Sequence, residues 1–163
     1  MDTTMLKILL AVCVLCAHPM STAQPSKEPP MTRIAAGEFV VKLLPLGLEG
    51  SDPNRDSKFG RMSIDKTISG GLVATTVGQM LTAMTEVKGS AGYVAIEKVD
   101  GVLDGRKGSF ALQHTGTMNR GAPSLSVTVV PDSGTQELIG LAGDFKIIIA
   151  DGKHSYEFKY TLP

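Results

Sequence analysis

The sequence predicts an all-β fold, a single closed antiparallel barrel of eight strands with at most a short helical turn. Short runs of β-branched and aromatic residues show period-two alternation, and clusters of Gly, Asp, Asn and Pro separate them. Hardly any segment between Ala35 and Leu162 has helical periodicity. Eight strands in sequence order can close into a barrel without free edges, and a two-sheet sandwich is the alternative.

The strands are predicted from the spacing of the turn residues. They cover residues 37–44, 61–69, 72–80, 92–103, 107–118, 124–130, 143–150 and 155–162. Gly70-Gly71, Asp104-Gly105 and Asp151-Gly152 are signals of tight hairpin turns. The last strand alternates most regularly, with four large apolar residues on one face: Tyr156, Phe158, Tyr160 and Leu162.

The first two dozen residues have the features of an export signal. Lys7 precedes an apolar run that is too short to span a bilayer, and Ser21-Thr22-Ala23 offers a cleavage site. We expect residues 1–23 to be a signal peptide, 24–35 a flexible leader and 36–163 the barrel domain, exported to the periplasm or secreted. Lipid attachment at Cys13 is the alternative, although Val12 is bulky where a small residue is required.

Composition excludes several kinds of chemistry. Both cysteines lie in the predicted signal, so the mature chain is expected to have no disulfide and no thiol chemistry. It keeps two histidines, His114 and His154, and we predict neither a metal site nor a cofactor. His154 follows the Asp151-Gly152 turn and is interpreted as a solvated turn residue. Serine-hydrolase and nucleotide-binding motifs do not occur in the sequence.

The charge balance gives no indication of a polyanionic partner. Basic and acidic residues number 16 each, so no long-range attraction for nucleic acid or an anionic membrane surface is expected. No membrane span is predicted, and the sequence defines no oligomeric state.

Several long motifs in the mature chain resemble a bacterial domain family of unknown function that shares the allene oxide cyclase-like barrel. The motifs are Phe59-Gly60-Arg61-Met62-Ser63, Lys88-Gly89-Ser90-Ala91-Gly92-Tyr93-Val94-Ala95-Ile96-Glu97, Leu112-Gln113-His114-Thr115-Gly116-Thr117-Met118, Val129-Val130-Pro131-Asp132-Ser133-Gly134-Thr135 and Leu138-Ile139-Gly140-Leu141-Ala142-Gly143. The resemblance covers about residues 36–162, nearly the whole mature chain. The resemblance implies the barrel fold and supplies no reaction, so no catalytic residues are carried over.

The hairpin around Asp104-Gly105 contains the most informative polar residues. A two-residue turn pairs Ala95 with His114, which places Tyr93, Glu97 and His114 on one face of the hairpin. That face also carries most of the large apolar side chains, so we expect it to face the barrel interior. A buried Glu and His need partners, and they can satisfy each other in a structural network or line a pocket.

The favoured interpretation is an exported barrel that binds a small, largely apolar ligand, with Tyr93, Glu97 and His114 as candidate ligand-binding residues. A cyclase- or isomerase-type enzyme that uses the same residues for proton movement is the first alternative. A filled, non-catalytic structural barrel is the second. A cavity of a few hundred cubic ångströms would favour either of the first two over the third.

Overall fold

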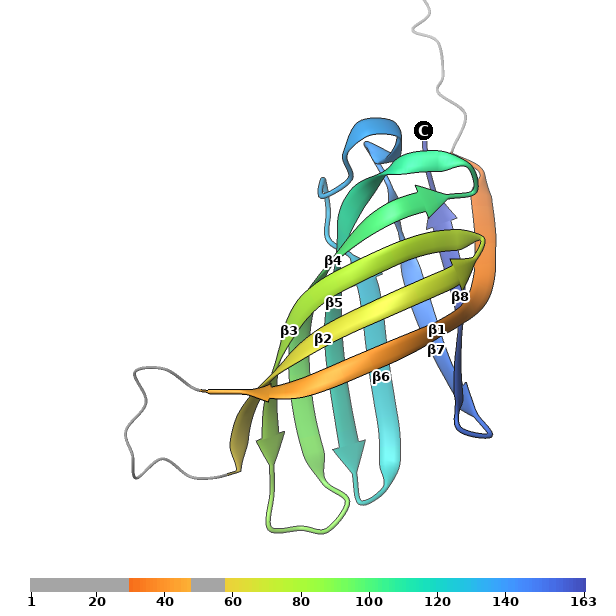
Figure 1. Cartoon of the computed structure of the whole chain (residues 1–163). Coiled ribbons are helices and arrows are strands. Elements are labelled where there is room, and N and C mark those ends of the chain that lie inside the picture. The colour runs from red at the N-terminus through yellow and green to blue at the C-terminus, as the bar shows by residue number, and fades with distance from the viewer. Residues whose placement is uncertain (1–29, 48–57) are drawn as a thin grey trace, which may run out of the picture.

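The computed structural model describes residues 30–47 and 58–163, and they form a closed barrel of eight antiparallel strands in sequence order. The strands are β1 (Thr32–Leu46), β2 (Phe59–Gly70), β3 (Leu72–Met84), β4 (Ala91–Leu103), β5 (Arg106–Asn119), β6 (Ala122–Val129), β7 (Ala142–Ala150) and β8 (Lys153–Thr161). Figure 1 shows the strands wrapping around one interior, with β1 closing the wall against β8. The predicted fold class is confirmed, and the sandwich is excluded.

A single 3-10 turn, η1 (Gln136–Leu138), connects β6 to β7. Leu138 of this turn is fully buried in the hydrophobic core, so the turn packs against one end of the barrel. No helix in the described ranges is long and apolar enough to cross a membrane.

The barrel begins earlier than the sequence predicted. β1 starts at Thr32, four residues before the expected domain start, and Thr32 to Ala35 pair with β8 from Thr161 to Phe158. Ala35 is 2% exposed and belongs to the core, so the last part of the predicted leader is a structural strand. The predicted signal peptide and the rest of the leader lie almost entirely outside the described residues.

The interior divides into a filled half and an open half. The filled half lies towards the β2–β3 and β4–β5 turns and is packed with stacked aromatic rings. Phe145 stacks on Tyr156 at a centroid distance of 4.8 Å, and Phe110 stacks on Phe158 at 5.8 Å. The open half lies where the β3–β4 and β5–β6 connections meet, at the lower end in Figure 1.

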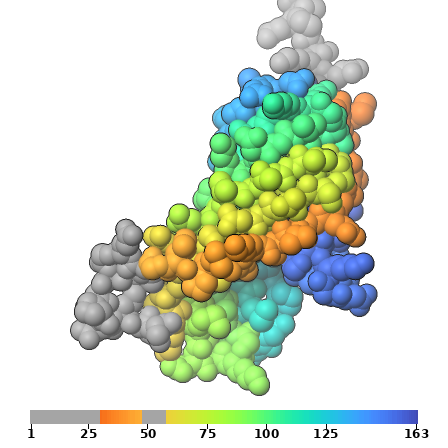
Figure 2. Space-filling model, viewed as in Figure 1, coloured from red at the N-terminus to blue at the C-terminus, as the bar shows by residue number. Residues whose placement is uncertain are grey.

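The barrel wall has one weak seam. Most neighbouring strands share eight or more register pairs, but β6 and β7 share a single pair, Thr128 with Asp144. In Figure 1 the tip of the β7–β8 hairpin stands apart from the β5–β6 connection, and the hairpin tip also projects in Figure 2. Elsewhere on that face, Figure 2 shows the side chains of β1, β2 and β3 as a continuous surface.

Candidate functional site

The β4–β5 hairpin has the register that its turn residues predicted. Leu103 pairs with Arg106 across the turn, Ala95 pairs with His114, and Tyr93 pairs with Gly116. Glu97 and His114 are 0% and 2% exposed, whereas Val94 and Ile96 on the opposite face are about half exposed. The predicted face therefore points into the barrel.

Glu97 lies at the centre of a buried polar cluster that spans four consecutive strands. Its Oε2 accepts a hydrogen bond from Lys66 Nζ at 2.5 Å and lies 3.0 Å from His114 Nε2. Its Oε1 accepts a short hydrogen bond from the hydroxyl of Thr76. The hydroxyl oxygen of Thr76 in turn accepts the backbone N–H of Lys66 at 3.0 Å, so β2, β3, β4 and β5 are tied together.

The contact between Glu97 and His114 was expected from the sequence, whereas Lys66 and Thr76 were not. Lys66 sits on the same alternating face as Ile64 and Ile68 in β2, and Thr76 follows Leu72 and Ala74 in β3. Lys66 could have been identified from the sequence, because it is a lysine on the strand face that otherwise carries apolar side chains.

The electrostatics of the cluster favour an ionised Glu97. Burial alone raises the pKa of a carboxyl group, because the charged form loses its hydration. Three neighbours outweigh this effect of burial: His114, the charge and hydrogen bond of Lys66, and the Thr76 hydroxyl. The pKa of Glu97 therefore lies below its ordinary value. Lys66 is compensated further by the Phe39 ring, whose centroid lies 5.3 Å from Nζ.

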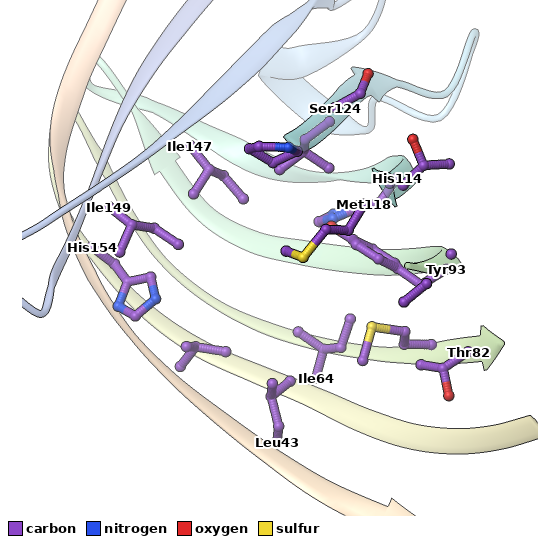
Figure 3. Close-up of a pocket in the computed structure, with 18 of the residues that line it drawn as sticks. Leu43, Ile64, Thr82, Tyr93, His114, Met118, Ser124, Ile147, Ile149 and His154 are labelled. Carbon is purple, nitrogen blue, oxygen red and sulfur yellow. The ribbon is translucent and has the colours of Figure 1, made fainter. Parts of the chain in front are cut away.

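A cavity of about 470 Å³ occupies the open half of the barrel. Most of its wall is apolar, formed by Phe39, Val41, Leu43, Ile64, Met80, Met84, Ala91, Met118, Pro123, Leu125, Ile147 and Ile149. Polar groups reach it at Lys66, Thr82, Tyr93, His114, Thr117, Ser124 and His154. Figure 3 shows Leu43 and Ile64 on one side of this space, with Ile147 and Ile149 across from them.

The three predicted residues occupy different positions relative to the cavity. Tyr93 and His114 line it, from neighbouring positions on β4 and β5 (Figure 3). Glu97 is completely buried behind Lys66 and His114, which form this part of the wall. Glu97 can therefore act on a cavity ligand by holding Lys66 and His114 in place.

Tyr93 owes its position to a glycine on the next strand. A Cβ on Gly116 would lie 2.2 Å from Cε1 of the Tyr93 ring, so only glycine lets the ring rest flat on β5. Burial, and then the negative charge of Glu97, raise the pKa of Tyr93. Tyr93 is therefore a neutral hydroxyl beside the cavity at physiological pH.

The interpretation of His154 as a solvated turn residue was wrong. Its ring lies 5.2 Å from the Phe39 ring, and it lines the cavity (Figure 3). His154 lies on the same face of β8 as the buried Tyr156 and Phe158, so its side chain points inward although a turn is adjacent to it.

Within the described ranges, no group of three or more His, Cys, Asp or Glu side chains is arranged to hold a metal ion. The four groups of the cluster are instead one carboxylate, one ammonium, one imidazole and one hydroxyl. This combination can donate hydrogen bonds, accept them and move protons.

Comparisons with known proteins give a family and no activity. No curated protein matches the chain. A crystal structure of a protein of unknown function from the DUF3224 family of Shewanella oneidensis MR-1 is 47% identical to this chain, with a TM-score of 0.74. The match covers 82% of this chain and 98% of the Shewanella chain. The model of a family described as protein of unknown function (DUF3224) matches residues 35–160. The chain therefore belongs to the DUF3224 family.

Proposed function

We propose that this protein binds a small, largely apolar molecule inside its barrel. The observation that carries the proposal is the cavity of about 470 Å³, whose wall is mostly apolar and carries a few polar groups. Pockets for small molecules have this size and this composition, because apolar walls supply the affinity and a few polar groups fix the orientation. A barrel that served only as a structural element would gain stability by filling this space.

Three methionines give the wall a capacity to adapt to a ligand. Met80, Met84 and Met118 line the cavity near the ends of β3 and β5. Methionine side chains are flexible and polarizable, so they fit apolar molecules of differing shape.

Ligand binding can be tested with an apolar fluorescent probe, N-phenyl-1-naphthylamine, whose emission rises in an apolar environment. The probe should bind with one-to-one stoichiometry, and Leu43→Trp should weaken it because the larger side chain enters the cavity. Leu44→Trp is the matched control: Leu44 and Leu43 are 46% and 44% exposed, but Leu44 is on the outer face of β1. Equal weakening by both variants, or no probe binding by the wild type, would contradict the proposal.

We further propose that the protein acts after export, in the periplasm or outside the cell. The support is the sequence of residues 1–23, with its short apolar run and the small residues before Gln24. Intact mass of the protein recovered from the exported fraction should correspond to a chain that begins at Gln24. A lipid-modified form that begins at Cys13 would show membrane anchoring instead.

A further inference from the structure

The buried charged group of the cavity wall offers hydrogen-bond donors that have no acceptor among the described residues. Lys66 is 6% exposed and lines the cavity, and its ammonium group carries three N–H donors. In the part of the chain that the structure describes, its one hydrogen-bond acceptor is Glu97 Oε2. The other two donors of this buried group have no acceptor there, which is costly unless a group inside the cavity supplies one.

His114 has a similarly incomplete environment. Its Nε2 is buried and lies 3.0 Å from Glu97 Oε2, but the N–H of the ring does not point at this oxygen closely enough for a hydrogen bond. Among the described residues, Nε2 has no other hydrogen-bond partner. His114 also lines the cavity, on the strand next to that of Glu97. The incompletely bonded groups of Lys66 and His114 therefore flank Glu97 and border the same space.

The charges of the cluster favour a neutral partner over an anionic one. The positive charge of Lys66 is already balanced by Glu97, which lies 2.5 Å away. A ligand carboxylate at Lys66 would bring a second negative charge close to Glu97 inside a buried site, where like charges repel strongly. A carbonyl or ether oxygen accepts a hydrogen bond from an ammonium group without adding charge.

We infer that the ligand is an apolar molecule with a neutral oxygen acceptor, such as a ketone or an ester, and that this oxygen is bound by Lys66 beside His114. The apolar body then lies against Phe39, Ile64 and Ile147, and extends towards the methionines near the open end. This inference rests on the proposed ligand binding and adds the chemical class of the ligand.

The test uses three probes of equal chain length: 2-undecanone, undecane and undecanoate. Their affinities are measured by displacement of N-phenyl-1-naphthylamine. The informative quantity is the ratio of the affinities for 2-undecanone and undecane, because it cancels the contribution of the apolar chain. Replacement of both charged residues, in the Lys66→Met/Glu97→Gln variant, should lower this ratio by about tenfold, which corresponds to the loss of one hydrogen bond to a charged donor.

Two controls keep the result interpretable. The double variant removes both charges, so neither Lys66 nor Glu97 is left buried without its partner, and its folding is verified by denaturant unfolding. Thr75→Val removes a hydroxyl from the exposed outer face of β3, outside the cavity, and should change the ratio by less than about twofold.

The outcomes separate this inference from the proposed function. If all three probes fail to bind the wild type, both are wrong. If the probes bind but the ratio is the same in the wild type and the double variant, ligand binding stands and the assignment of Lys66 is overturned. Tighter binding of undecanoate than of 2-undecanone, lost in the double variant, would show that the site takes an anion and would overturn the neutral class.

Discussion

The ammonium group of Lys66 lies 2.5 Å from Oε2 of Glu97, although the two residues are 31 positions apart and belong to strands that are not neighbours. β3 lies between β2 and β4 in the wall, so the contact passes over the inner face of β3. On β3, Gly78 pairs with Glu97, and a Cβ at Gly78 would lie 3.0 Å from the Glu97 Cβ, so a glycine lets β3 lie close to Glu97. Thr76 of the same strand pairs with Lys66, and its hydroxyl bonds the other carboxylate oxygen of Glu97.

Breaking this pair should destabilise the protein more than removing His114. Glu97→Gln leaves the Lys66 ammonium buried without its counter-charge and should cost about 3–5 kcal/mol. His114→Asn removes a contact that is poorly aligned and should cost only about 1–3 kcal/mol. Because Lys66 and Glu97 contact each other, Lys66→Met/Glu97→Gln should cost less than the sum of its two single changes.

Urea unfolding at neutral pH measures all four variants. Additive costs for Lys66 and Glu97 would show that the two charges are not coupled in solution, and the cluster described above would then be wrong.

Stability should fall in acid partly through Glu97. The pKa of this group in the folded protein lies below its ordinary value of 4.5, so the unfolded chain takes up a proton at a higher pH than the folded one. Its contribution is therefore complete above about pH 4.5 and is lost as the pH falls through the folded pKa. The free-energy difference between wild type and Glu97→Gln should be constant from about pH 6 to about pH 4.5 and should shrink as the pH falls towards about pH 3.

Other carboxylates contribute equally to both proteins and cancel in that difference. A constant difference over the whole range would mean that Glu97 titrates alike in the folded and unfolded states.

The fold was predictable because its signals are local. Period-two alternation gave the strands, and Gly70-Gly71, Asp104-Gly105 and Asp151-Gly152 gave the turns that the structure places there. The register of β4 and β5 followed from the turn length, and the apolar side chains on one face of this hairpin indicated that Glu97 and His114 point inward. The start of β1 was placed too late because Thr32 to Ala36 pair with β8, at the other end of the sequence.

The candidate site was only partly predictable, because half of it depends on contacts between distant segments. The Glu97–His114 contact lies within one hairpin, whereas the Lys66–Glu97 contact needs the curvature of the barrel. Likewise, the cavity exists because large inward side chains fill one half of the barrel and not the other. Strand alternation predicts which side chains point inward but not how completely they fill each half.

The alternating face of the last strand provides a test of the packed half of the barrel. Phe158 is 0% exposed and contacts the rings of Phe110, Phe145 and Tyr160. Phe158→Ala should therefore cost about 3–5 kcal/mol. The neighbouring Glu157 is exposed on the outer face, and Glu157→Ala should change stability by less than about 0.5 kcal/mol. Equal costs in denaturant unfolding would contradict the inward assignment of this face.

All three tyrosines should resist ionisation in the folded protein. Burial is the largest cause of the raised pKa of Tyr93, Tyr156 and Tyr160, and the hydrogen bond from the Tyr160 hydroxyl to Asp104 raises the pKa of Tyr160 further. The unfolded chain loses these protons near pH 10, so stability should decline as the pH rises above that value. Tyrosinate absorbance should therefore appear at higher pH in the native protein than in urea, and coincident curves would contradict this.

The seam between β6 and β7 should be the place where the barrel wall opens most readily. With Thr128 and Asp144 as the one register pair, the rest of β7 is held by β8 and by packing. In residues 145–150, alternate backbone amides point towards β6 and the others bond to β8. The amides that bond to β8 are therefore an internal control for those that point towards β6. Hydrogen exchange followed by NMR should show the amides directed at β6 exchanging at least about tenfold faster, as expected for backbone groups outside a ladder. Uniform protection along β7 would show that β6 and β7 pair over a longer stretch in solution, and the wall would then have no weak seam.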